Sequence, residues 1–324
     1  MNPSNSINKQ KVALVLSSGG ARGFAHIGVI ETLLENNYEI SSIAGCSMGS
    51  LIGGVYCTGE LDKFKEWATG LQKADVFKLY DFTFAANGLV KGEKVFREIQ
   101  QFLPDRDISE LNIPFTAIAT DVVDQKEYIF KNGPLYDALR ASCAIPGVVK
   151  PVEIKGKQLL DGGILNPLPL NLIEKRDDEL LVAVNVNACV PHHAPVRSPE
   201  EVIADKAFDR KVWTMLNKWL KRDKPATKHP KPEKLQEEKK KFGFFELMLR
   251  ASDMMQDRLT DKMVELYPPH MLVNISRKAG GTFEYYRAEE FIEAGRQATL
   301  SALTRHQLIK NEKNKSGYNR AAAS

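Results

Sequence analysis

The segment from Ile43 to Leu51 constrains the fold more than any other stretch of this sequence. It places the pattern G-x-S-x-G between an apolar run typical of a buried strand and residues that favour a helix. In a nucleophile elbow, the serine occupies a strained turn between a strand and a helix, which exposes its hydroxyl. Such a turn leaves no room for side chains two residues before and after the serine, where Gly45 and Gly49 stand. Ser47 is therefore a candidate nucleophile, and the dipole of the following helix would favour an oxyanion beside it.

Length and composition limit the number of domains and the class of protein that this sequence can form. The 324 residues fit one large α/β domain or two smaller ones, and 43% hydrophobic residues suffice for a substantial core. No apolar run approaches the roughly 18 residues of a membrane span. The apolar run at residues 12–16 is too short for a secretion signal. The four cysteines are scattered without a C-x-x-C pair, which favours reduced thiols and a cytoplasmic protein.

A second glycine motif, Ser18–Gly23, lies between the first predicted strand and a predicted helix. Such a loop presents backbone N–H groups at a helix start, which makes it an anion site. Three uses are open: an oxyanion hole built near Gly19 and Gly20, a dinucleotide phosphate site, or a simple tight turn. The oxyanion hole is favoured because the loop and Ser47 would follow adjacent strands, at the edge where α/β sheets bind ligands. Dinucleotide binding requires a glycine in place of Ser18 and an acidic residue about 20 positions later.

Strands and helices alternate along the rest of the chain. Continuous apolar runs predict buried strands, and apolar residues at three- to four-residue spacing predict helices. We expect strands at 11–17, 115–120, 127–130, 159–160, 180–186 and 271–275, and helices at 24–35, 135–142, 246–266 and 288–308, with 60–104 largely helical and a loop at 85–88.

Basic charge is concentrated in one region. Residues 206–241 hold 13 Lys/Arg and 5 Asp/Glu, a local charge of +8 in a chain of net charge +4. Residues 206–222 carry Trp213 and Trp219 on one face of a lysine-rich predicted helix. This pattern is typical either of a helix lying in a membrane interface or of a helix packed on the protein body. We expect no nucleic-acid binding, because most charge runs are solvated faces.

Four motifs follow one another in a fixed order. They are Gly19-Gly20-Ala21-Arg22-Gly23, then Gly45-x-Ser47-x-Gly49, then Ala141-Ser142-Cys143-Ala144-Ile145-Pro146, then Asp161-Gly162-Gly163 with Asn166-Pro167-Leu168-Pro169. Together they resemble the patatin-like phospholipase family in its bacterial branch. The resemblance is dense over residues 11–190 and looser over 246–305. Ser18 departs from it, because the family usually has the first of three glycines there.

The resemblance implies a three-layer α/β/α patatin-like fold with a mostly parallel central sheet. It implies one hydrolase domain over residues 11–305, into which a basic, helical segment at 190–245 is inserted. We expect a disordered N-terminus at 1–10 and a polar tail at 306–324.

The resemblance also implies a catalytic dyad, with Ser47 as the nucleophile and Asp161 as the general base. A dyad is chemically sufficient, because one carboxylate can take the hydroxyl proton and later activate water. No metal or cofactor is expected. The implied oxyanion hole comprises Gly19, Gly20, Ala21, Arg22 and Met48, and the supporting motif glycines are Gly23, Gly45, Gly49, Gly162 and Gly163.

The implied function is hydrolysis of lipid carboxyl esters, of phospholipase A or lysophospholipase type. The alternatives are acyl transfer on the same dyad and a non-catalytic lipid-binding regulatory module. A serine–histidine triad would need His270 or His306, which come late in the chain, whereas His26 is expected to be a packing residue in its helix. The expected partner is a phospholipid or other acyl ester, with residues 206–222 as the candidate for peripheral membrane contact.

Overall fold

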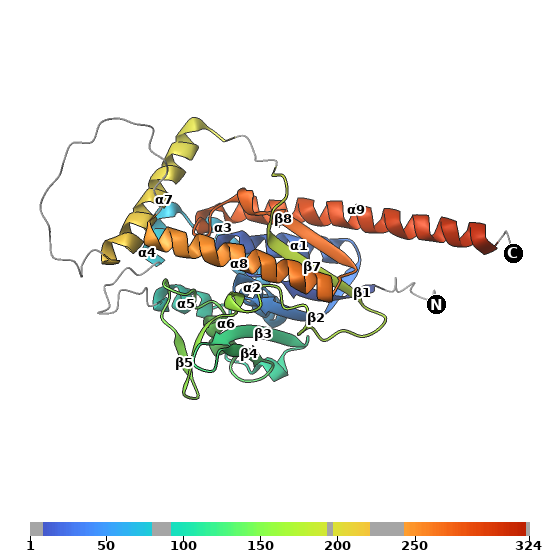
Figure 1. Cartoon of the computed structure of the whole chain (residues 1–324), viewed down its shortest axis with the longest axis horizontal. Helices are drawn as coiled ribbons and strands as arrows, with labels where there is room; N and C mark the ends of the chain where they lie inside the picture. Colours follow the sequence, from blue (N-terminus) through green and yellow to red (C-terminus); the bar gives the residue numbers. More distant parts are fainter. Residues whose placement is uncertain (1–8, 80–91, 193–196, 221–242, 322–324) are drawn as a thin grey trace, which may run out of the picture.

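The computed structural model describes the backbone of residues 9–79, 92–192, 197–220 and 243–321, and the side chains of these residues except 216–220, 245 and 312–321. Within them, one sheet of eight strands is flanked by helices on both faces (Figure 1). The fold is therefore α/β with three layers, as expected. Its helices are α1 (Ala25–Glu35), α2 (Met48–Thr58), α3 (Leu61–Gly70), α4 (Lys73–Leu79), α5 (Glu93–Gln100), α6 (Leu135–Ser142), α7 (Pro199–Leu220), α8 (Phe244–Leu266) and α9 (Ala288–Ala321).

Five strands form the parallel part of the sheet, and Ser47 lies at its carboxyl edge. The central strands are buried on both faces, as their continuous apolar sequences predict. Because all five strands run the same way, their carboxyl ends meet at one edge, and Ser47 follows the second strand there. In spatial order they are β3 (Phe115–Asp121), β2 (Tyr38–Cys46), β1 (Gln10–Leu16), β7 (Leu180–Ala188) and β8 (Met271–Ser276).

Three antiparallel strands complete the sheet around β3. These are β4 (Lys126–Phe130) and β6 (Lys157–Asp161), which both pair with β3, and β5 (Val152–Ile154), which pairs with β6. No local pattern predicts β5, because this strand of three residues has a charged residue at its centre.

The register of β3 brings the two predicted catalytic residues together. Cys46 pairs with Ile118, and Asp161 pairs with the next residue, Ala119, on the same side of β3, because β4 occupies the other side of both residues. The parallel strand β2 and the antiparallel strand β6 therefore end facing each other beside β3, and Ser47 and Asp161 meet at that point.

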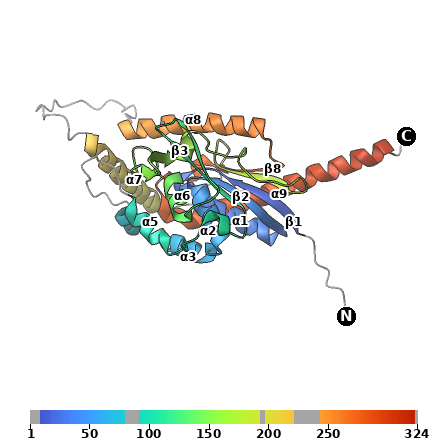
Figure 2. The ribbon, with the colours of Figure 1, turned by 90° about the horizontal axis from the view of Figure 1, so that it is seen from below.

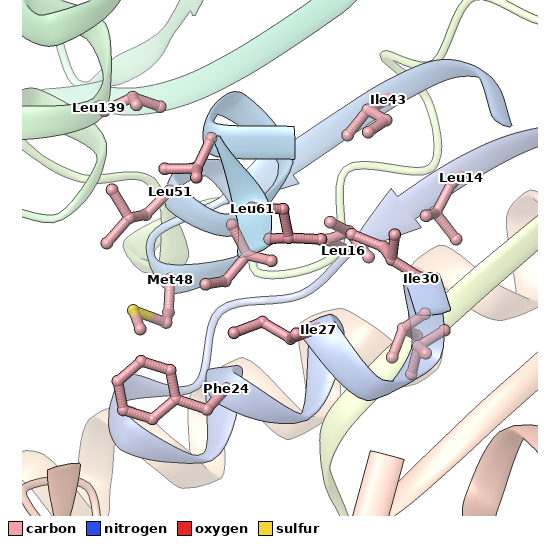
Figure 3. Close-up of a cluster of buried hydrophobic side chains, with 14 of the residues drawn as sticks. Leu14, Leu16, Phe24, Ile27, Ile30, Ile43, Met48, Leu51, Leu61 and Leu139 are labelled. Atoms are coloured by element: carbon pink, nitrogen blue, oxygen red, sulfur yellow. The ribbon is translucent and has the colours of Figure 1, made fainter. Parts of the chain in front are cut away.

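Helices cover the two faces of the sheet unequally. On β1, Leu14 and Leu16 belong to the large core cluster under α1, α2 and α9, and Figure 3 shows them beside the side chains of α1 and α2. Ala13 and Val15 point the other way into a smaller cluster, on which Met263 of α8 packs. The helices α1, α2 and α9 thus form one outer layer, and α8 contributes to the other.

The C-terminal helix is longer than expected. We predicted that it ends at Leu308 and that a polar tail follows, but α9 continues to Ala321 and projects beyond the sheet (Figures 1 and 2). Residues 309–316 contain neither glycine nor proline, so nothing local interrupts helix propagation there. The loop expected at 85–88 and the N-terminal residues 1–8 lie outside the described residues.

The helix α7 shows how the basic region meets the body. Phe208 and Val212 of α7 are buried, and Trp213 lies edge-on to Phe283 with ring centroids 5.8 Å apart. This part of the apolar face therefore packs on the protein, whereas the side chain of Trp219 is outside the described residues. No helix in the described part of the chain is long and apolar enough to cross a membrane.

Replacing Trp213 tests this packing. We expect Trp213→Ala to lower the free energy of unfolding by about 1 to 3 kcal/mol, because it removes a half-buried aromatic contact. Chemical denaturation measures the change, with the exposed neighbour Thr214→Ala as the matched control. Normal stability combined with weaker binding to anionic lipid vesicles would instead place Trp213 in a membrane interface.

Candidate active site

The turn at Ser47 has the strained geometry of a nucleophile elbow. Its φ of 52° and ψ of −124° are unusual for a residue with a side chain. A Cβ on Gly45 would lie 2.6 Å from the Cα of Ser50, and one on Gly49 would lie 2.4 Å from the carbonyl oxygen of Leu16. Both glycines are thus required by close backbone contacts, as the sequence predicts.

Ser47 and Asp161 are hydrogen-bonded. The Ser47 hydroxyl donates to Oδ2 of Asp161 over 2.5 Å, and Oδ1 of the same carboxylate accepts the N–H of Gly163 at 2.8 Å. The backbone of Asp161 is held on both sides, since its N–H donates to the carbonyl of Ala144 and its carbonyl accepts the hydroxyl of Thr120. The carboxylate is therefore fixed within reach of the serine proton.

Burial tunes Asp161 for proton transfer. Desolvation raises the pKa of this carboxyl from 3.8 to about 6, against hydrogen bonds from Ser47, Gly163 and Cys46 that lower it. A carboxylate with a raised pKa is a stronger base, and at neutral pH it is still mostly ionised. Asp161 can therefore accept a proton at the pH at which most enzymes work.

Gly162 allows the chain to turn sharply after β6. A Cβ on this residue would lie 2.4 Å from the carbonyl oxygen of Ile118, which belongs to β3, the strand beside which Ser47 and Asp161 meet. A Cβ on Gly163 would lie 3.0 Å from Nε2 of Gln256. The two glycines let Asp161 end its strand tightly against β3.

The predicted oxyanion loop forms a short 3-10 helix, Gly20–Phe24, and its residues fall into two groups. Gly20 and Met48 line the same cavity as Ser47, and each is the first residue of a helix, where the backbone N–H has no partner within that helix. Gly19 lines the second cavity that contains Ser47. Ala21 does not fit the prediction, because its N–H already donates to the carbonyl of Thr282 at 2.9 Å.

The conformation of the loop explains its glycines. Gly20 has a φ of +53°, and a Cβ there would lie 2.6 Å from the side chain of Thr282. A Cβ on Gly23 would lie 2.2 Å from Cγ of Met48, so this glycine lets the loop pack directly on the start of α2.

Arg22 supports the loop through its side chain. Its guanidinium donates to the side-chain oxygen of Asn187, with its shortest distance at 2.7 Å, and to the carbonyl of Gly280 at 2.9 Å. Asn187 in turn donates to the carbonyl of Ser18. Arg22 was predicted as part of the oxyanion hole through the backbone of the loop, and its side-chain contacts hold that loop against Asn187 and Gly280.

The site predicted from the sequence did not include two residues that contact it in the structure. Ser142 accepts the backbone N–H of Ser47 at 2.9 Å and so fixes the nucleophile turn. It stands within one of the four motifs, and that position was the available signal. Asn187 lies at the carboxyl end of β7, on the same sheet edge as Ser47, and this placement could have identified it.

Two cavities meet at Ser47. The first is almost entirely apolar, with about 920 Å³ of space including its open mouth, and is lined by residues from α2 to α5 and by Phe283. The second lies between the glycine loop and α8 and is called the polar cavity here because polar side chains, including Arg22, Asn187 and Asp253, contribute to its lining beside apolar ones. An apolar cavity and a cavity with polar side chains, both reaching Ser47, suit an ester with an apolar acyl chain and a polar alcohol.

Neither His270 nor His306, the two candidates for a triad, lies at Ser47. His26 is fully buried, hydrogen-bonded to the carbonyl of Ser17, and burial lowers its pKa to about 4, which fits the packing role that we expected. His270 accepts the N–H of Leu181 at the amino-terminal end of β7, the edge opposite the site. His306 lies near His270. Among the described residues, no group of three or more His, Cys, Asp or Glu side chains could hold a metal ion.

Comparison with known proteins agrees with the fold and the motifs. The patatin-like phospholipase family model matches residues 14–173. An uncharacterized NTE family protein of Mycobacterium tuberculosis is 34% identical over 339 residues, which cover 93% of this chain and 94% of that protein. The chain belongs to the patatin-like phospholipase family, which confirms the resemblance noted from its four motifs.

More distant relatives match only a part of longer proteins. The lysophospholipase NTE1 of Candida glabrata is 27% identical over 74% of this chain but only 13% of its own length. The lysophospholipase NTE1 of Kluyveromyces lactis is 27% identical over 86% of this chain and 18% of that protein. Among solved structures, VipD from Legionella pneumophila aligns with a TM-score of 0.44 and 12% identity, over 92% of this chain and 67% of that one.

The raised pKa of Asp161 predicts the pH dependence of the site. A general base must be ionised, so kcat/KM for a soluble ester should fall about tenfold per pH unit below pH 6 and level off above it. Initial rates between pH 4.5 and 8 measure this limb, and circular dichroism at each pH controls for unfolding. Full activity at pH 4.5 in the folded protein would show that Asp161 is not the base.

Proposed function

We propose that this chain is a serine acyl hydrolase that cleaves lipid carboxyl esters, of phospholipase A or lysophospholipase type. The observation that carries the proposal is the hydrogen bond from Ser47 to Asp161 at the junction of an apolar and a polar cavity. The family and the fungal lysophospholipases that match this chain support a lipid ester as the substrate.

The first half of the reaction forms an acyl-enzyme. Ser47 Oγ attacks the ester carbonyl carbon while its proton passes to Oδ2 of Asp161. The carbonyl oxygen becomes an oxyanion, which the N–H groups of Gly20 and Met48 and the dipole of α2 can stabilise. As the tetrahedral intermediate collapses, the C–O bond to the alcohol breaks and Asp161 returns the proton to the leaving oxygen.

The second half of the reaction releases the acid. Asp161 takes a proton from a water molecule, and the resulting hydroxide attacks the acyl carbonyl. The bond to Ser47 breaks and the serine oxygen recovers a proton from Asp161, so the free enzyme and a fatty acid remain. Both halves use the same pair of side chains, which agrees with a dyad rather than a triad.

An acyltransferase would use the same first half and differ only in the acceptor. Adding a thiol or an alcohol as an acceptor during turnover separates the two activities, because a hydrolase releases free fatty acid and a transferase forms a new ester or thioester. A non-catalytic lipid-binding module is a weaker alternative, because binding alone does not require a serine hydrogen-bonded to a buried carboxylate.

The dyad can be tested at each of its residues. We expect Ser47→Ala to abolish both labelling by a fluorophosphonate probe and ester hydrolysis, because it removes the nucleophile. We expect Asp161→Asn to lower kcat by about 10²- to 10⁴-fold, the usual contribution of a general base.

Controls for this test are available in the chain. His270→Ala removes the histidine of the rejected triad and should leave turnover near wild type, and thermal unfolding checks that each variant is folded. The proposal fails if Ser47→Ala retains wild-type turnover or if His270→Ala is inactive while Asp161→Asn is active.

A further inference from the structure

The helix α8 borders the polar cavity, and two contacts fix which of its faces points inward. Gln256 accepts a hydrogen bond from the hydroxyl of Ser18 at 3.0 Å, and Asp257 forms an ion pair with Arg277. Asp253 lies one turn before these two residues, so it shares the inward face of the helix.

The exposure of neighbouring residues agrees with this orientation. Met254 and Met255, on the outward side of α8, are 62% and 61% exposed. Asp253 instead lines the polar cavity that also contains Ser47, together with the side chains of Ser252 and Gln256. Its carboxylate therefore faces the space beside the nucleophile.

The carboxylate of Asp253 has no hydrogen-bond donor among the residues that the structure describes. Arg22 is close enough to act on it electrostatically, but the guanidinium donates to Asn187 and Gly280 instead. Burial raises the pKa of Asp253, against the opposing influence of Arg22 and Arg277. A partly desolvated carboxylate without a donor is unfavourable, and a ligand that supplies one would be bound more tightly.

We propose that Asp253 determines substrate specificity by accepting a hydrogen bond from a free hydroxyl on the alcohol half of the ester, as in a monoacyl glycerophospholipid. This inference rests on the proposed function. With the acyl chain in the apolar cavity and its carbonyl carbon at Ser47, the alcohol half extends into the polar cavity. A diacyl lipid carries a second ester in place of the hydroxyl, so it offers no donor and leaves Asp253 unpaired.

The test pairs two substrates with one variant. The substrates are a lysophospholipid and its deoxy analogue, which lacks only the glycerol hydroxyl. In the wild type we expect kcat/KM to be about 10- to 100-fold lower for the deoxy analogue, as for loss of a hydrogen bond to a charged group. In Asp253→Leu the two substrates should react within about threefold of each other, and Asp253→Asn, which keeps an acceptor oxygen, should retain part of the discrimination.

Asp261→Leu is the matched control, because it makes the same change at an exposed position of the same helix. It should discriminate between the two substrates as the wild type does. The inference is overturned if Asp253→Leu keeps full discrimination. It is equally overturned if Asp253→Leu lowers kcat/KM for both substrates by the same factor, since that result describes a purely structural residue.

The test also separates this inference from the proposed function. Ser47→Ala is assayed in parallel on a simple nitrophenyl ester. If Ser47→Ala loses this turnover while Asp253→Leu still discriminates between the two lysophospholipid substrates as the wild type does, only the role of Asp253 is rejected. Retention of that turnover in Ser47→Ala rejects the hydrolase mechanism itself.

Discussion

The hydrogen bond between Ser47 and Asp161 joins two parts of the sheet that are built differently. Ser47 follows a parallel strand and is forced into its turn by contacts that exclude any side chain at Gly45 and Gly49. Asp161 ends an antiparallel strand and is placed by its pairing with β3 and by the close approach of Gly162 to Ile118. The geometry of the pair therefore depends on the register of β2 and of β6 along the same side of β3, and a slip of one residue in either pairing would separate the two side chains.

The buried dyad lowers the stability of the fold. The pKa of Asp161 is raised from 3.8 to about 6 in the folded protein, so folding favours the protonated carboxyl. Well below pH 3.8 the group is protonated in both the folded and the unfolded state, and no penalty arises. As pH rises to 6 and beyond, keeping the carboxylate ionised inside the protein costs about 3 kcal/mol, since one pKa unit corresponds to about 1.4 kcal/mol. The same desolvation that strengthens the base thus works against folding.

Local sequence patterns predict the elements that position the site. They do not predict the features of the site that depend on contacts between segments far apart in the sequence. The elbow at Ser47, the glycine loop and the turn after Asp161 each follow from residues within a few positions, because close backbone packing demands glycine there. The engagement of the Ala21 amide by Thr282 could not be predicted, since the two residues are far apart in the sequence. The packing of Trp213 on Phe283 was one of two open possibilities, because an apolar helix face fits either a protein or a lipid partner.

Ser18 connects the glycine loop to the helix that borders the polar cavity. The family usually has a glycine at this position. The hydroxyl of Ser18 donates to the side chain of Gln256 in α8. Its backbone N–H donates to the carbonyl of Pro167, and its backbone carbonyl accepts from the side chain of Asn187. A glycine could make the two backbone contacts but not the one to α8. The serine therefore couples the position of the loop to that of α8, and Asp253 lies on the same helix one turn from Gln256. The same hydrogen bond therefore joins the loop that carries the amides of Gly19 and Gly20 to the helix that carries Asp253.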